Sequence, residues 1–93
     1  MNKYETIIIM DNKITEEQRN TVISRVRDYI LANGEITKEQ DLGEKKLAYE
    51  VRKCQRGYYY LIKFNAKSTS IAELERIYRI TDEIIKFIVV REN

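Results

Sequence analysis

The 93-residue sequence has no histidine, no proline and only one cysteine. Without histidine it lacks the commonest general base and the commonest metal ligand of proteins. The single Cys54 cannot form an internal disulfide, which favours a reducing compartment. Although Lys53 and Arg56 flank this thiol, no histidine is present to act as its base, and we interpret Cys54 as an incidental loop residue.

Other enzyme signatures are missing as well. The sequence has no glycine-rich phosphate loop, no cysteine pair for zinc and no acidic cluster at catalytic spacing. Acylphosphatases, small enzymes of the architecture derived below, need an arginine in the loop after the first strand. Here that loop reads Asp11-Asn12-Lys13. We therefore predict a protein that is not an enzyme and needs no cofactor.

Long apolar runs are also absent. None approaches the roughly 20 residues of a membrane-spanning helix, and the N-terminus has no signal or transit pattern, so we expect a cytoplasmic protein with no membrane partner. The chain is 43% hydrophobic and 34% charged, which is typical of a globular protein. With no proline and three glycines it shows no linker, so residues 1–93 are expected to form one small domain.

Hydrophobic periodicity predicts the first three elements. Residues 3–10 are apolar on both faces, which indicates a central strand. A capping box at Thr15 and Gln18 begins a helix that Asn33-Gly34 ends, with Gly34 expected in the left-handed conformation. Residues 35–52 form a long irregular strand, bent by a bulge or turn near Gly43.

The second half of the chain continues with a hairpin. Residues 53–57 are predicted as its loop, with a positive φ at Gly57. In the next strand Tyr58 and Tyr60 point toward the core, and Tyr59 points to the other face. A second capping box at Ser70 and Glu73 begins another helix, and residues 87–91 form the last strand.

The resulting order is strand, helix, strand, strand, helix, strand. It predicts an α+β ferredoxin-like βαββαβ sandwich, whose four-stranded, mostly antiparallel sheet carries both helices on one face. The second strand is then an edge strand. The helix-free face would be apolar and needs a partner to cover it; its residues would be Ile7, Ile9, Tyr59, Leu61, Ile88 and Val90.

The hairpin is also the most basic part of the chain. The net charge of +2 says little, but residues 45–67 contain Glu50 as their only acid. Basic residues neutralise phosphates and an exposed tyrosine can stack on a base, so this pattern indicates nucleic-acid binding. No RNP-type motif is present, and a basic loop by itself is usually only solvated.

Four stretches resemble the bacterial small-subunit ribosomal protein six family. They are the opening KYE with its apolar strand, LGEKKLAYEV, GYYYLIKF and RITDEIIKFIVVR. The resemblance implies a ferredoxin-like, non-enzymatic constituent of the small ribosomal subunit. It also implies binding to the central domain of 16S ribosomal RNA together with ribosomal protein eighteen, as a heterodimer and without a small-molecule substrate.

The resemblance also implies RNA contacts at Lys3, at Lys45 and Lys46 in the strand bend, and at Arg79 after the second helix. The charge pattern of the hairpin adds three more, which are Arg52, Lys53 and Arg56. For the protein partner, the expected contacts are Tyr59, Leu61 and Lys63. Tyr4 matches the family's N-terminal tyrosine but is equally compatible with the core. The alternative hypothesis is a ferredoxin-like regulatory or metabolite-binding domain that forms a homodimer through its open sheet face.

Overall fold

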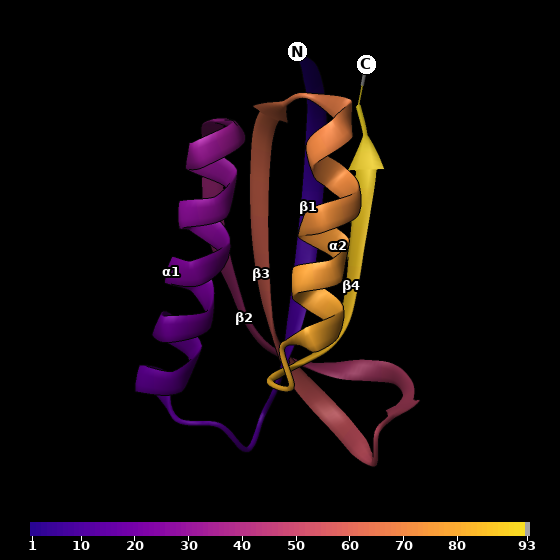
Figure 1. The fold of residues 1–93 in the computed structure, drawn as a ribbon. Coiled ribbons are helices and arrows are strands. Elements are labelled where there is room, and N and C mark those ends of the chain that lie inside the picture. Colours follow the sequence, from indigo (N-terminus) through magenta and orange to yellow (C-terminus); the bar gives the residue numbers. More distant parts are fainter. Residues whose placement is uncertain (93) are drawn as a thin grey trace.

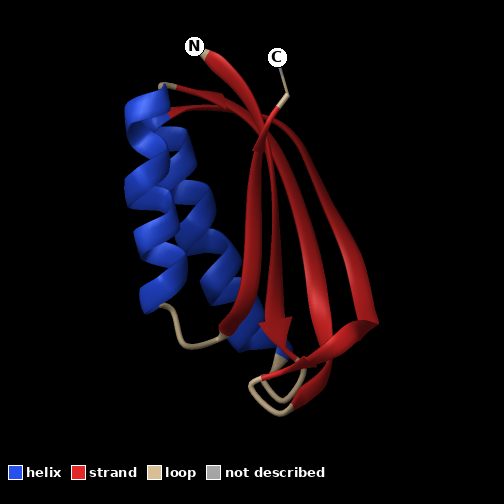
Figure 2. Cartoon of the chain, turned by 90° about the vertical axis from the view of Figure 1, so that its right-hand side faces the viewer, coloured by secondary structure: helices blue, strands red, loops and turns tan. Residues whose placement is uncertain are grey.

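Four strands and two helices follow one another in the predicted order in this computed structural model, which describes residues 1–92. The elements are β1 (Asn2–Asp11), α1 (Glu16–Asn33), β2 (Gly34–Val51), β3 (Cys54–Ala66), the short 3-10 helix η1 (Ser68–Ser70), α2 (Ile71–Ile80) and β4 (Ile84–Arg91). The sheet order is β2-β3-β1-β4, and every neighbouring pair is antiparallel. Both helices lie on one face of the sheet (Figure 1, Figure 2), which confirms the ferredoxin-like prediction.

The two central strands divide their side chains between the two faces, as the alternation predicts. Ile8 and Ile62 are fully buried under the helices, and Tyr58 and Tyr60 pack against the same cluster. Tyr4 also belongs to this core, with its ring stacked on Phe64 at a centroid distance of 5.5 Å. Tyr4 is therefore a core residue.

Helix α1 begins at the predicted capping box. The hydroxyl of Thr15 accepts a hydrogen bond from the Gln18 amide at 3.1 Å, and the Gln18 side chain accepts one from the Thr15 amide at 2.8 Å. The helix ends at Asn33, as predicted. The prediction of a left-handed conformation for Gly34 is wrong, because Gly34 has an extended φ of 178°. Glycine is needed there because a Cβ would overlap the carbonyl oxygen of Asn65 on β3.

Strand β2 is a single long edge strand with the predicted bend. The pairing of β2 with β3 shifts between Asp41 and Gly43, and Gly43 has a φ of 80°. That left-handed conformation is one that glycine adopts at little cost. The bend separates a first half beside the helices from a second half that leaves the plane of the sheet (Figure 1).

The hairpin loop lies earlier in the chain than the sequence predicts. The turn consists of Arg52 and Lys53, whose φ angles are 49° and 64°, and β3 already begins at Cys54. A two-residue turn with both residues at positive φ matches the right-handed twist of the flanking strands. Gly57 lies within β3 and does not have a positive φ. It is small for another reason, since a Cβ would lie 2.5 Å from Cγ2 of Ile9.

The second predicted capping box does not form. Ser70 ends η1 and makes no side-chain cap; its hydroxyl donates instead to the carbonyl of Lys67 at 2.6 Å. Helix α2 still buries Leu74 and Tyr78 as its periodicity indicates. Strand β4 is longer than predicted because it starts at Ile84.

Candidate nucleic-acid interface

The distal part of the β2–β3 hairpin, residues 43–57, bends across one end of the helix-free face; we call it the arm. It carries Leu47 and Cys54 into a second buried cluster with Ile9 and Ile85. The prediction of an uncovered apolar face is therefore only partly right, because the chain covers one end of that face itself. Sequence periodicity missed this contact, since it joins residues far apart along the chain.

The arm exposes all five cations that the sequence assigned to it, which are Lys45, Lys46, Arg52, Lys53 and Arg56. Arg56 has a partner within the arm, and Arg52 has one outside it. The Arg56 guanidinium lies 3.4 Å from the Glu44 carboxylate, and Arg52 donates to the Asp82 carbonyl at 3.3 Å. The second contact ties the tip of the arm to the turn between α2 and β4. This contact holds the tip of the arm, with its exposed cations, against the rest of the protein.

Arg79 lies at the same end of the molecule as the arm. It belongs to the last turn of α2, whereas the sequence placed it after the helix. Its guanidinium is 3.8 Å from the Glu75 carboxylate and 5.7 Å from the centre of the Phe87 ring. Because α2 ends at the turn that Arg52 contacts, Arg79 lies at the same end of the molecule as the tip of the arm.

Lys3 lies at the opposite end of the sheet. In the β1–β3 ladder Lys3 pairs with Asn65, whereas Asp11 pairs with Gly57 at the base of the arm. Lys3 and Asp11 are eight residues apart along β1, about 26 Å at the usual rise of a strand. Six of the seven candidate RNA contacts therefore lie at one end of the molecule, and Lys3 lies at the other, where its carbonyl accepts a hydrogen bond from the Glu92 amide at 2.8 Å. Both termini are at that end (Figure 1).

The sequence analysis missed Tyr49, which lies on the arm, and Lys86, which lies beside it. The ammonium of Lys86 on β4 donates to the hydroxyl of Tyr49 on the arm at 2.8 Å. Lys86 pairs with Ile9 in the β1–β4 ladder, so it shares the helix-free face. Lys86 is two residues before Ile88 and four before Val90, so the same period-two pattern that placed those residues on the helix-free face also predicts Lys86 there. The position of Tyr49 beside it depends on the bend of the arm.

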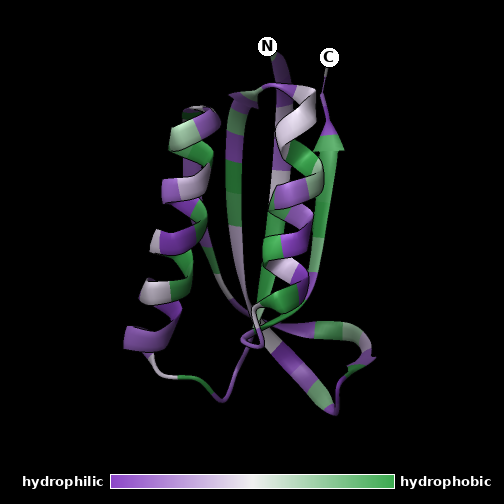
Figure 3. Ribbon diagram, viewed as in Figure 1, coloured by the Kyte–Doolittle hydropathy of each residue, from purple (hydrophilic) through white to green (hydrophobic). Residues whose placement is uncertain are grey.

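The candidate partner contacts Tyr59, Leu61 and Lys63 lie on one face of β3, but they differ in exposure. Leu61 is only 7% exposed and Tyr59 is half-buried beneath the arm. Lys63 lies 4.0 Å from the Glu5 carboxylate and 3.9 Å from that of Glu92. The free apolar surface of this face is on β4, where Ile88 is 47% exposed and Val90 is 49% exposed. Figure 3 shows β4 as hydrophobic along most of its length.

Cys54 is a core residue, not the loop residue that the sequence indicated. Its side chain is 3% exposed in the cluster under the arm. Burial raises the pKa of the Cys54 thiol, and the nearby Asp11 carboxylate adds to the rise. The thiol is therefore held in its neutral form, and the flanking cations do not activate it.

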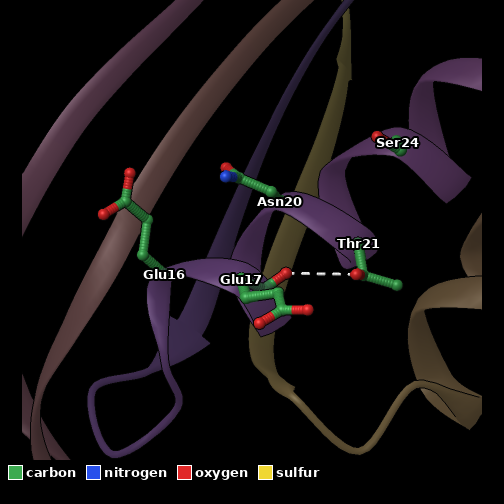
Figure 4. Close-up of a pocket in the computed structure, with 5 residues that line it drawn as sticks. All are labelled: Glu16, Glu17, Asn20, Thr21 and Ser24. Atoms are coloured by element: carbon green, nitrogen blue, oxygen red, sulfur yellow. Dashed lines mark hydrogen bonds between the residues drawn. The ribbon is translucent and has the colours of Figure 1, made fainter.

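A groove on the outer surface of α1 offers no catalytic arrangement. It is a shallow depression along α1 lined by Glu16, Glu17, Asn20, Thr21 and Ser24, where the Thr21 hydroxyl donates to the Glu17 carbonyl at 3.1 Å (Figure 4). Within residues 1–92 no three acidic or cysteine side chains are grouped to hold a metal ion. None of the described helices is both long and apolar enough to cross a membrane.

Comparison with known proteins agrees with the resemblance noted in the sequence. Residues 3–91 match the family model described as Ribosomal protein S6. The small ribosomal subunit protein bS6 of a Nitratiruptor species is 41% identical over 92 residues, covering 98% of this chain and 72% of the relative. The bS6 protein of Thermoanaerobacter pseudethanolicus is also 41% identical, with 98% and 97% of the two chains covered.

A solved structure shows the same fold. The crystal structure of 30S ribosomal protein S6 from Thermotoga maritima is similar with a TM-score of 0.93 and 34% identity, covering 98% of this chain and 87% of that one. Its fold, the family model and the relatives all lead to one assignment. The chain belongs to the ribosomal protein S6 family and is a structural, non-enzymatic constituent of the small ribosomal subunit.

Proposed function

We propose that this protein binds the central domain of 16S ribosomal RNA together with ribosomal protein eighteen. The main support for RNA binding is the group of exposed cations on the arm. A protein of the small ribosomal subunit is expected to contact RNA, and these cations can do so. The alternative of a regulatory or metabolite-binding homodimer is not favoured, since relatives at 41% identity are small ribosomal subunit proteins.

The RNA side of the proposal is electrostatic. Lysine and arginine side chains on the arm displace counterions from the phosphate backbone, so binding should weaken as salt increases. The proposed contacts on this end are Lys45, Lys46, Arg52, Lys53, Arg56 and Arg79. Lys3 is proposed as a separate contact at the far end of the sheet, where it borders a small cavity with Lys63 and Asn65.

The protein side of the proposal uses the part of the helix-free face that the arm leaves uncovered. Tyr59, Leu61 and Lys63 on β3 form one column of this face, in which the arm half covers Tyr59 and Leu61 is only 7% exposed. Beyond β1, Ile88 and Val90 add the exposed apolar area that a partner would remove from water.

The Lys45→Ala/Lys46→Ala pair tests the RNA proposal. We expect it to weaken binding of the heterodimer to a central-domain 16S fragment and to lower the salt slope by roughly 0.7–0.9 per lost phosphate contact. The measurement is the dissociation constant at several salt concentrations. A matched control is Lys38→Ala/Lys67→Ala, which removes the same charge from exposed positions away from the arm.

Equal affinity and salt slope for both double variants would mean that the arm is merely a solvated surface. Arg56→Ala tests the tip of the arm separately. An unchanged affinity for that variant removes only Arg56 from the proposed contacts, since Arg56 already has Glu44 as a partner.

A further inference from the structure

Tyr49 is an exposed aromatic side chain for which the fold gives no packing reason. It is 63% exposed and is the one aromatic among the large hydrophobic residues exposed in residues 1–92. It lies on the arm between Lys46 and Arg52 in sequence. An aromatic ring left in water beside cations is the composition of a surface that binds single-stranded nucleic acid.

The ring of Tyr49 is held at its hydroxyl edge. The ammonium of Lys86 is 2.8 Å from the phenol oxygen and 4.6 Å from the ring centroid, so it donates to the hydroxyl and also makes a cation–π contact near the hydroxyl end of the ring. Because Tyr49 is 63% exposed, much of the ring surface stays accessible while Lys86 holds its hydroxyl end. A lysine ammonium has three donors, and one donor to Tyr49 leaves two for another acceptor.

A hollow adjoins this ring. The cavity measures about 260 Å³ and is bordered by Tyr49, Lys46, Gln55 and Glu50. These side chains suit different parts of a nucleotide: the ammonium of Lys46 suits a phosphate, and the amide of Gln55 can both donate to and accept from a base edge. The Glu50 carboxylate only accepts, so it would face an exocyclic amine and not a phosphate.

We propose that Tyr49 stacks on an unpaired RNA base, with Lys46 and Lys86 contacting the adjoining phosphates. The inference rests on the proposed function, because it takes RNA as the ligand of the arm. It adds a different kind of contact to that function. The cations of the arm bind phosphates in any RNA sequence, whereas a base that stacks on Tyr49 must be unpaired and outside the RNA helix. The ligand of the arm is thus a bulged or looped nucleotide beside a helix backbone.

The absence of tryptophan allows a direct test. In the Tyr49→Trp variant the new indole is the only one in the chain. We expect its fluorescence to be quenched by a single-stranded octamer of adenosine and not by an RNA duplex of equal charge. The control is Leu31→Trp, an exposed position (52%) near the C-terminal end of α1, where neither RNA should quench. No quenching of Tyr49→Trp by the single strand overturns the inference.

Affinity measurements separate this inference from the proposed function. For binding of the heterodimer to the central-domain fragment, we expect Tyr49→Leu to lose roughly 5- to 150-fold, and Tyr49→Phe to stay within about twofold because the ring is kept. Tyr49→Leu should leave the salt slope unchanged, whereas Lys46→Ala should lower it by roughly 0.7. If the wild-type protein does not bind the fragment, the proposed function fails.

If the wild type binds and Tyr49→Leu binds equally well, only the stacking inference fails. If Tyr49→Leu instead abolishes co-purification of ribosomal protein eighteen, Tyr49 is a protein contact and the inference is overturned as well. Tyr49→Leu and Tyr49→Phe should both unfold at the wild-type urea concentration, since the side chain is exposed.

Discussion

The hydroxyl of Tyr78 on α2 donates a hydrogen bond to the hydroxyl of Thr6 on β1, with the two oxygens 3.1 Å apart in the core. The direction follows from the second bond of Thr6, whose single hydrogen is donated to the Ile88 carbonyl at 2.8 Å. Both side chains are at most 1% exposed. Burial raises the pKa of Tyr78, which keeps the phenol in its neutral, donating form.

We expect Thr6→Val to destabilise the fold more than Tyr78→Phe does. The first variant leaves the buried phenol without its acceptor, at a cost of about 1–3 kcal/mol, whereas the second removes a donor and leaves Thr6 bound to Ile88. The double variant should be more stable than the sum of the two single changes predicts, because the stranded phenol is gone. Urea unfolding of the three variants measures this, and strictly additive free energies would contradict it.

The pair of Arg27 on α1 and Glu39 on β2 predicts a dependence of stability on pH. Arg27 donates to both carboxylate oxygens at 2.8–3.1 Å, and the Tyr60 hydroxyl donates to one of them at 2.9 Å. The Arg27 hydrogen bonds lower the pKa of Glu39, against the opposing effect of burial. A carboxylate with a lowered folded-state pKa stabilises the fold above its unfolded pKa, and this contribution is lost as the pH falls through the folded value.

Glu39→Gln should therefore reduce the free energy of unfolding at pH 7 by only about 0.5–1 kcal/mol, because the pair is partly exposed and screened by solvent. The difference from wild type should shrink below about pH 4.3, where the unfolded carboxyl takes up its proton. The effect of Arg27→Met should shrink in the same range, since this variant removes the partner. Urea unfolding between pH 3 and pH 7 decides the matter; curves that stay parallel over that range would refute the linkage.

Gly34 and Gly43 should respond in opposite ways to the same substitutions. At Gly34 a Cβ overlaps the Asn65 carbonyl oxygen, so alanine should destabilise the β2–β3 ladder by roughly 1–3 kcal/mol and asparagine by more. At Gly43 nothing lies within 4 Å, and the cost comes only from its φ of 80°. Asparagine adopts that conformation more readily than alanine, so Gly43→Asn should be the milder change. Thermal unfolding of the four variants tests this ranking.

On the helix-free face, the exposed residues of β4 give a sharper test of partner binding than the buried residue of β3. Ile88→Asp places a charge on a residue that is 47% exposed, so it should weaken co-purification of ribosomal protein eighteen while the isolated protein stays folded. Leu61→Asp places a charge where the side chain is 7% exposed, so it should unfold the protein instead. Tyr59→Asp, at a half-buried position, should both weaken partner binding and lower the stability of the isolated protein, each to a smaller extent.

Co-purification and a urea melt of each variant give the two readings. A fully retained partner with Ile88→Asp and with Tyr59→Asp would place the partner elsewhere. A stable Leu61→Asp variant that loses the partner would restore Leu61 as a direct contact.

The sequence by itself determined the features that depend on neighbours a few residues apart. The alternation of Tyr58, Tyr59 and Tyr60 between the two faces follows from the pleat of a strand. The cap at Thr15 and Gln18 closes within one turn of helix. The order of elements then left few ways to build the sheet.

Tertiary structure decided what depends on distant contacts. The arm folds back because Leu47 and Cys54 can be buried against Ile9 and Ile85, a gain in hydrophobic contact that no local pattern of residues 43–57 reveals. In the folded arm the turn is at Arg52 and Lys53, and the Cys54 thiol is buried. The same arrangement covers part of Tyr59 and places Tyr49 beside Lys86. Charge along the chain indicated which residues are candidates for binding; their distances in space, with Lys3 at one end and the arm at the other, exist only once the strands have paired.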